Sequence, residues 1–110
     1  MSGRLIIAAV ALLFTALAVG SAGAAQEGGA LVGRGKLLFT DQGCYGCHTV
    51  GKFGTPIAPD LSHVGAKYKV GDLTRWLRDP AAQKPTAHMP KISLSEAEVR
   101  ALAAYLASLH

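Results

Sequence analysis

The stretch "CYGCHTV", residues 44–50, holds the only two cysteines of this 110-residue chain. The two thiols lie three positions apart, and His48 follows the second one directly. Thiols at this spacing occur in zinc sites, in redox-active dithiols and in covalent haem attachment sites. The residues around this stretch, and the rest of the chain, distinguish among the three.

Zinc sites usually have four tetrahedral ligands, arranged in the sequence as two separated pairs. Cys44 and Cys47 supply one pair, but His48 is adjacent to Cys47 and poorly placed to bind the same ion. None of the other histidines has a ligand-pair spacing; they are His63, His88 and His110. A thioredoxin-like dithiol lies near a βαβ unit, and we expect no strand before Cys44.

A structural disulfide would leave His48 without a role and would close a loop too small to add much stability. Haem attachment gives all three residues a role. The two thiols add to the vinyl groups of the haem, and the adjacent imidazole binds the iron, so that C-x-x-C-H is the signature of c-type haem. We therefore predict one haem c, attached through thioether bonds from Cys44 and Cys47, with His48 as an axial ligand.

The N-terminus has the pattern of a secretory signal peptide over residues 1–25. Arg4 is its one positive side chain, an uncharged apolar run covers 5–19, and a string of small residues follows. This order is typical of exported proteins. We expect cleavage near Ala24 or Ala25.

An uncleaved membrane anchor is the alternative, since residues 5–25 are long enough to cross a bilayer. In either case we predict export to the periplasm, with membrane attachment only if the leader is retained. We then expect a flexible lead-in at 26–32 and one domain at 33–110. Without its first 25 residues the chain has 85, a length at which a domain usually needs a disulfide, a metal or a covalent cofactor.

The charge of the chain is modestly positive, with 11 Lys and Arg against 7 Asp and Glu. The basic residues are scattered, and only 6% of the residues are aromatic. Nucleic-acid-binding domains instead show clustered basic residues. We therefore expect no nucleic-acid partner.

Helical patterns dominate the first part of the domain. Residues 35–43 suit a short helix that ends at Gly43 and leads into Cys44. Residues 49–69 are rich in Gly and Pro and are expected to form an ordered loop. A second helix is predicted over Leu73–Asp79, capped by Asp72 and ended by Pro80.

The C-terminal helix has the clearest signals. Ser95 and Glu98 form a capping box, and Leu94 and Val99 are spaced for a hydrophobic staple. Beyond them, apolar residues recur at helical spacing, which predicts one buried face; these are Val99, Leu102, Leu106 and Leu109. The sequence thus predicts a small all-α domain of three to four helices, with long loops wrapped around one covalent haem.

Met89 is the candidate for the second axial ligand of the iron. Pro90 holds it out of the α region, in an extended segment that can reach across the haem. Alternatively, Met89 fills a gap in the core, the usual role of a methionine. His88 is a rival ligand, and His63 is a weaker one.

The chain resembles class I (monohaem) cytochrome c, in its bacterial periplasmic branch, over residues 33–109. The resemblance rests on the helix with Gly35 and Phe39, on "CYGCH", "APDL", the Trp76 helix ending at "RDP" and "HMP", and on the last helix with Tyr105.

The resemblance implies that Met89 is the distal ligand. It also implies that the carbonyl of Pro59, or alternatively of Pro56, accepts a hydrogen bond from His48, and that Trp76 packs by the haem and can donate to a propionate. Close contact between the first and last helices is implied as well, with Gly35 and Phe39 against Tyr105.

With both axial positions filled, the expected function is one-electron transfer between exported or membrane redox proteins, without enzymatic activity of its own. Expected partners carry acidic docking surfaces, attracted by lysines near the haem edge; these are Lys52, Lys84 and Lys91. Two alternatives stay open. One is a permanently bound subunit of an exported dehydrogenase or reductase, and the other is a five-coordinate haem protein that acts on small ligands or peroxide.

Overall fold

The computed structural model describes residues 19–110 of the chain, and its side chains from residue 23 onward. Helices dominate this part, and the only strands described are two of two residues each. The predicted all-α class is therefore confirmed. Most of the predicted signal segment, residues 1–18, lies outside the described residues. Within 19–110, no helix is both long and apolar enough to span a bilayer.

Helix α1 (Val19–Asp41) is longer than the sequence pattern predicted. The helix expected at 35–43 is its C-terminal part, and residues 26–32, predicted as a flexible lead-in, are helical. The first proline of the chain is Pro56, so nothing in this region forbids a helix. Each glycine in it costs only about 1 kcal/mol relative to alanine, which leaves the glycine-containing segment compatible with a continuous helix.

Helix α5 (Glu96–Ala107) begins with the predicted capping box. The hydroxyl of Ser95 accepts from the N–H of Glu98 at 3.1 Å, and the Glu98 carboxylate accepts from the N–H of Ser95 at 2.9 Å. Leu94 packs against the core cluster that contains Val99, in agreement with the staple pattern. The reciprocal cap fixes where the last helix starts.

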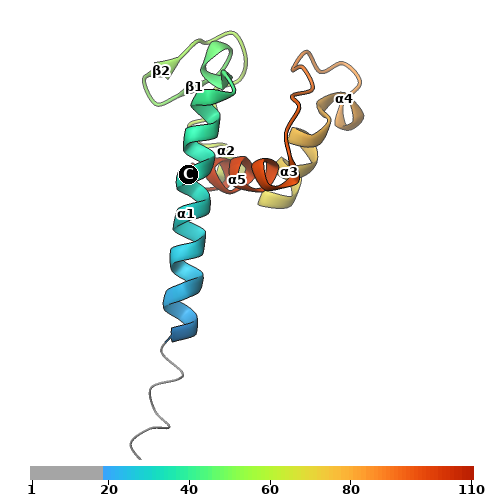
Figure 1. Cartoon of the computed structure of the whole chain (residues 1–110). Helices are drawn as coiled ribbons and strands as arrows, with labels where there is room; N and C mark the ends of the chain where they lie inside the picture. Colours follow the sequence, from blue (N-terminus) through green and yellow to red (C-terminus); the bar gives the residue numbers. More distant parts are fainter. Residues whose placement is uncertain (1–18) are drawn as a thin grey trace, which may run out of the picture.

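Helices α1 and α5 cross and pack against each other (Figure 1). Gly35 lies at the crossing, where a Cβ atom would overlap the carbonyl of Ala101 and come within 2.6 Å of the Tyr105 Cβ. Next to it, the rings of Phe39 and Tyr105 meet edge to face with centroids 5.7 Å apart. The absence of a side chain on Gly35 is therefore what permits this close crossing.

Helix α3 (Val70–Arg78) packs on the opposite part of α5 and is followed by the single turn α4 (Pro80–Gln83). The prediction that Asp72 caps α3 was wrong by three residues, since the helix begins earlier, after Lys69. Asp72 lies in the first turn, where its carboxylate accepts from the N–H of Lys69 at 3.1 Å. In a capping box, the side chain of the third helical residue accepts such a bond from the N–H of the N-cap residue. Asp72 thus still stabilises the start of the helix.

Short elements interrupt the predicted loop at 49–69. Strands β1 (Thr49–Val50) and β2 (Phe53–Gly54) form a small antiparallel hairpin, with Thr49 opposite Gly54. One turn of helix, α2 (Val64–Lys67), follows. Gly51 and Gly54 have positive φ angles of 60° and 105°, a conformation that glycine adopts without strain. These glycines explain the tight turn, which is too short to give a period-two pattern.

The hydrophobic core lies among α1, α2, α3 and α5. Its buried members are Phe39, Val64, Leu73, Leu77, Val99, Leu102, Ala103, Tyr105 and Leu106. Two long segments contribute no fully buried side chain: residues 40–63, which include the cysteines, and residues 81–98, which include Met89. Both rise from the helical frame in Figure 1. Several of their side chains pack partly against this core, and these retain surface that can pack on another group.

Replacing Gly35 by alanine should destabilise the protein even though alanine favours helices. The new methyl group would overlap α5, and overpacking of this kind costs about 1–3 kcal/mol. The matched control is Gly33→Ala in the same helix, where nothing lies within 4 Å of the added Cβ. That change should raise the free energy of unfolding by up to about 1 kcal/mol. Denaturant titration measures both, and equal effects would contradict the close crossing.

Candidate functional site

The two cysteines lie in the 3-10 turn η1 (Cys44–Gly46) and immediately after it. Gly43, with φ of 76°, separates this turn from the end of α1. Both thiols are free, with Cys44 half-buried and Cys47 exposed. Burial raises the pKa of the Cys44 thiol, whereas reactive redox thiols have lowered values. The environment of Cys44 thus differs from that of a redox-active dithiol.

The described residues offer no support for a zinc site. Within 19–110, His, Cys, Asp and Glu side chains form no group of three or more that could hold a metal ion. A zinc ion needs four such ligands, or three and a water molecule. Cys44 and Cys47 therefore lack the partners that a zinc site would require in this part of the chain.

The imidazole of His48 is held by the loop that follows the hairpin. Its Nδ1 lies 2.7 Å from the carbonyl oxygen of Pro59, the partner implied by the resemblance. A carbonyl oxygen can only accept a hydrogen bond, so Nδ1 must carry the proton. In the neutral ring, Nε2 then has a free lone pair. This is the tautomer that a histidine needs to bind a metal through Nε2.

Backbone hydrogen bonds hold the two loops together on either side of His48. The N–H of Ala58 donates to the carbonyl of Cys47 at 2.7 Å, and the N–H of Leu61 donates to the carbonyl of Thr49 at 2.9 Å. The carbonyl of His48 itself accepts from the N–H of Thr55 at 3.2 Å. The orientation of the imidazole is therefore built into the loop pairing.

Met89 lies in the segment between α4 and α5 and is partly buried against the core. The indole N–H of Trp76, on α3, donates to its sulfur atom at 3.1 Å. The resemblance implies that this N–H can donate to a haem propionate, and it does not predict the sulfur as an acceptor. The spacing of the two residues gives no signal for it, because the contact depends on how the Met89 segment folds back over α3.

The alternative ligands are more exposed than Met89. His88, directly before it, and His63, which precedes α2, both have exposed side chains. Of the three lysines expected near the docking surface, Lys91 lies 3.9 Å from the Asp79 carboxylate. Lys52 and Lys84 are also exposed.

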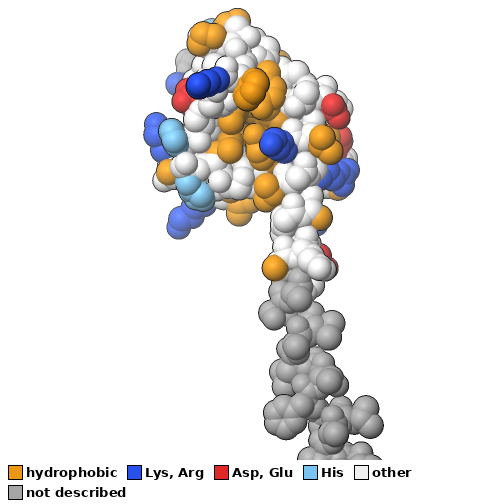
Figure 2. Space-filling model, turned by 90° about the vertical axis from the view of Figure 1, so that its left-hand side faces the viewer, with side chains coloured by type: hydrophobic (Ala, Val, Ile, Leu, Met, Phe, Trp, Pro, Cys, Tyr) orange, Lys and Arg blue, Asp and Glu red, His pale blue; other side chains and the backbone are white. Residues whose placement is uncertain are grey.

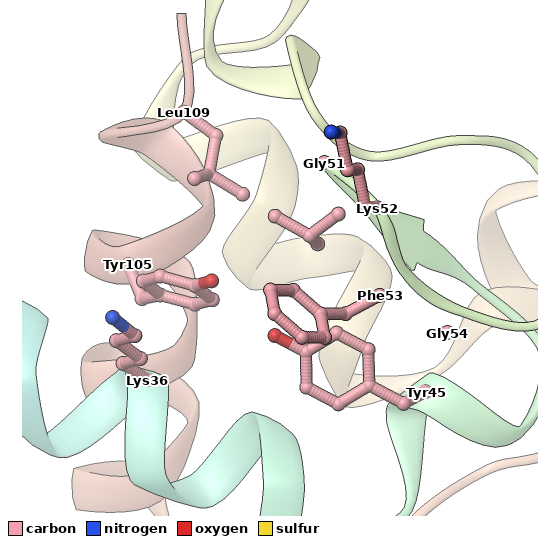
Figure 3. Close-up of a pocket in the computed structure, with 9 residues that line it drawn as sticks. Lys36, Tyr45, Gly51, Lys52, Phe53, Gly54, Tyr105 and Leu109 are labelled. Carbon is pink, nitrogen blue, oxygen red and sulfur yellow. The ribbon is translucent and has the colours of Figure 1, made fainter.

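An open hollow of about 820 Å³ lies between the hairpin, α1 and α5, and it does not include the cysteines, His48 or Met89. The rings of Tyr45, Phe53 and Tyr105 point into it, with Lys36 and Lys52 on opposite sides (Figure 3). Figure 2 shows apolar side chains gathered on the surface, with Lys or Arg side chains beside them. Tyr45 belongs to the "CYGCH" stretch, so this hollow adjoins the candidate site.

The residues present suit a covalent haem. Two free thiols stand next to an imidazole whose Nδ1 is occupied and whose Nε2 can bind iron. A thioether sulfur stands on a different segment. Both segments lack fully buried side chains of their own, and a flat apolar group gives them a surface to pack on.

Comparison with known proteins agrees with this donor set. The family model described as Cytochrome c matches residues 32–110. Cytochrome c oxidase subunit 2 of Alkalihalophilus pseudofirmus is 34% identical over 88 residues, which cover 72% of this chain and 26% of that protein. The chain thus spans about a quarter of the length of this relative.

Trp76→Phe should reveal the hydrogen bond to Met89, because it keeps an aromatic ring and removes the donor. We expect the free energy of unfolding to fall by about 0.5–1.5 kcal/mol. If the sulfur binds iron, the reduction potential should also fall, since the hydrogen bond withdraws electron density that favours the ferric state. Spectroelectrochemical titration measures the potential. An unchanged potential and stability would show that the indole does not act on the sulfur.

Proposed function

The chain belongs to the cytochrome c family, and on that premise we propose that it is a one-electron carrier whose haem iron is bound by His48 and Met89. Family membership makes it a class I c-type cytochrome, with haem c as cofactor and haem-based electron transfer as its activity. We further propose that one haem is attached covalently through Cys44 and Cys47. The pair of iron ligands and the role as a carrier are proposals as well.

The hydrogen bond from His48 to Pro59 is the observation that carries the proximal assignment. It fixes the tautomer of His48 in which Nε2 is free to bind a metal. Histidines that bind metals commonly donate their other ring N–H to a carbonyl or carboxylate in this way. His63 and His88 make no such bond in the structure described for 19–110.

Met89 is the distal ligand that the structure supports best. Its sulfur takes part in a specific contact with Trp76, whereas a methionine that only fills space needs no polar partner. It is also less exposed than His88 beside it. Pro90 keeps the segment extended, so the side chain is presented by a constrained backbone.

His/Met ligation defines the chemistry that the haem supplies, which is reversible one-electron transfer at a raised potential. The protein then positions and tunes the cofactor and provides no further reacting groups. With both axial positions filled by side chains, small molecules have no iron position to occupy. For this reason we propose that the chain is not an enzyme in its own right.

Redox proteins are the partners that family membership indicates. We propose that their docking surfaces are acidic, since the chain has a net charge of +4 and exposed lysines near the candidate site. Opposite charges increase the rate of encounter and the specificity of docking. We also propose export to the periplasm, which rests on the signal-like N-terminus.

A second function is a cytochrome module that works inside a larger oxidase. Similarity to cytochrome c oxidase subunit 2 favours it. In such a module, the haem would pass electrons to a fixed acceptor rather than to a diffusing one. Size-exclusion chromatography of the native complex distinguishes the two, since a carrier elutes alone and a module elutes with the oxidase.

Met89→Ala should empty the distal position of the iron. We expect the reduction potential to fall, because the thioether that favours ferrous iron is gone, and the ferrous protein should bind carbon monoxide readily. Met89→His is the matched control, in which a six-coordinate iron should return at a potential below that of the parent. Optical spectra and redox titrations follow both changes.

A different result is expected if Met89 does not bind the iron. If this residue only packs in the core, alanine should cost about 2–5 kcal/mol of stability and leave the spectrum and the potential as in the parent. That outcome would contradict the His48/Met89 pair. The five-coordinate haem protein or a His88 ligand would then replace the proposed site.

Electron exchange with an acidic partner should slow as the ionic strength rises, because salt screens the attraction between exposed charges. Lys52→Gln should lower the second-order rate at low salt. Arg100→Gln is the charge-matched control, as this exposed side chain lies on α5, and it should have a smaller effect. Stopped-flow kinetics measure the rates, and a flat salt dependence would contradict an acidic docking surface.

A further inference from the structure

The residue after Pro59 is tied into the same loop pairing by its side chain. One carboxylate oxygen of Asp60, Oδ1, accepts three hydrogen bonds. The hydroxyl of Thr49 donates at 2.8 Å, the hydroxyl of Ser62 at 2.7 Å and the N–H of Ser62 at 3.3 Å. The carboxylate therefore connects the chain just after His48 with the chain just after Pro59.

Ser62 extends this connection to the hairpin turn. Its hydroxyl oxygen accepts from the N–H of Gly51 at 2.7 Å while its proton goes to Asp60. The turn at Gly51 is thus held to the same carboxylate through a single hydroxyl group. Removing the carboxylate would leave the hydroxyl proton of Ser62 without its acceptor.

The hydrogen bonds have a regular register along the two loops. Cys47 pairs with Ala58 through the backbone, His48 pairs with Pro59 through its ring, and Thr49 pairs with Asp60 through side chains. Each step along one loop is matched by one step along the other. The Thr49–Asp60 contact is therefore next to the contact that sets the tautomer of His48.

Backbone hydrogen bonds on both sides of His48 already pair the two loops, and Tyr45, Val50 and Leu61 pack partly against the core. No side chain between residues 40 and 63 is fully buried, so the hydrogen bonds of Asp60 add a further constraint on the register. Pro59 has no N–H with which to hold itself in place. Pro56, in the same loop, carries another carbonyl that competes as an acceptor if the register slips. The side-chain contacts of Asp60 are thus well placed to select Pro59.

We propose that Asp60 is a positioning residue, whose carboxylate keeps the Pro59 carbonyl on the Nδ1–H of His48 and thereby sets how strongly Nε2 donates to the haem iron. This inference rests on the proposed function of His48 as the proximal ligand. A hydrogen bond on the far nitrogen of a ligating histidine raises its basicity. Asp60 acts on the iron only through Pro59 and His48.

The ionised state of the carboxylate suits this role. The hydroxyl of Ser62, followed by that of Thr49, lowers the pKa of Asp60 below its ordinary value. At neutral pH the group is therefore an acceptor only, as its donors require. Its contacts are charge-assisted, which makes them stronger than bonds between neutral groups.

Variants of the full-length holoprotein test the proposal. Asp60→Ala removes the acceptor, whereas Asp60→Asn removes the charge and retains an oxygen at the Oδ1 position. Asp41→Ala is the control for net charge, since this exposed carboxylate lies at the end of α1. Thr49→Val keeps the side-chain shape and removes one donor, and it serves as the second test if Asp60→Ala does not fold.

Two measurements report on His48 itself. Proton NMR of the ferric protein follows exchange of the Nδ1–H with solvent deuterium, and redox titration gives the potential. We expect Asp60→Ala to speed the exchange several-fold and to raise the potential, because a weakened hydrogen bond makes the imidazole a poorer donor to ferric iron. Asp60→Asn should retain most of the parent's slow exchange, Thr49→Val should be intermediate, and Asp41→Ala should match the parent.

The outcomes distinguish a failure of the proposed function of His48 from a failure of the proposed role of Asp60. A parent spectrum without a hyperfine-shifted histidine would refute the assignment of His48, and with it the proposed function. Parental exchange and potential in Asp60→Ala and Thr49→Val would overturn only the role of Asp60. If Asp60→Asn and Asp60→Ala shift the potential equally while exchange of the Nδ1–H stays parental in both, the charge acts on the iron through space, and the positioning role is also overturned.

Discussion

The crossing of α1 and α5 at Gly35 is the constraint on which the rest of the structure depends. Because Gly35 has no side chain, the two helices approach closely enough for Phe39 and Tyr105 to pack edge to face. The crossing fixes the direction in which α1 ends, and Gly43 then turns the chain so that Cys44 follows at once. The other part of α5 carries α3 and Trp76. The contacts of α5 with α1 and with α3 thus place the two helices from which the candidate ligand segments follow.

The two segments are held in a different way from the helices beneath them. The helical frame has a packed apolar core, whereas residues 40–63 and 81–98 contain no fully buried side chain. In the first segment, hydrogen bonds between paired loops supplement partial packing of side chains such as Tyr45 against the core, as in the contact from His48 to Pro59. A chain of this size has little apolar surface to spare for a second core. The proposed covalent haem would therefore serve as structural material in addition to its redox role.

The sequence was most informative where a residue type has one physical reason to be present. The capping box at Ser95 follows from local chemistry, whereas the close approach at Gly35 and the Pro59 carbonyl next to His48 were implied by the resemblance to class I cytochrome c; the structure shows each contact. Two features were missed. Helix α1 extends over residues expected to be flexible, because no proline interrupts it and each of its glycines costs only about 1 kcal/mol. The contact from Trp76 to Met89 was missed because no pattern predicts how a loop folds over a helix.

Two hydrogen bonds with opposite effects flank the proposed ligands. If His48 binds the iron, the hydrogen bond from its Nδ1–H to the Pro59 carbonyl would make Nε2 a stronger donor, which favours ferric iron. If Met89 binds it, the Trp76 N–H would draw electron density from the sulfur and make it a weaker donor, which favours ferrous iron. The ligand pair alone would set only the range of the potential. Its value within that range then depends on two groups that do not bind the iron, one held by a network of loop hydrogen bonds and the other by the packing of α3. The protein can therefore adjust each side of the haem independently, by changing a residue outside the coordination sphere.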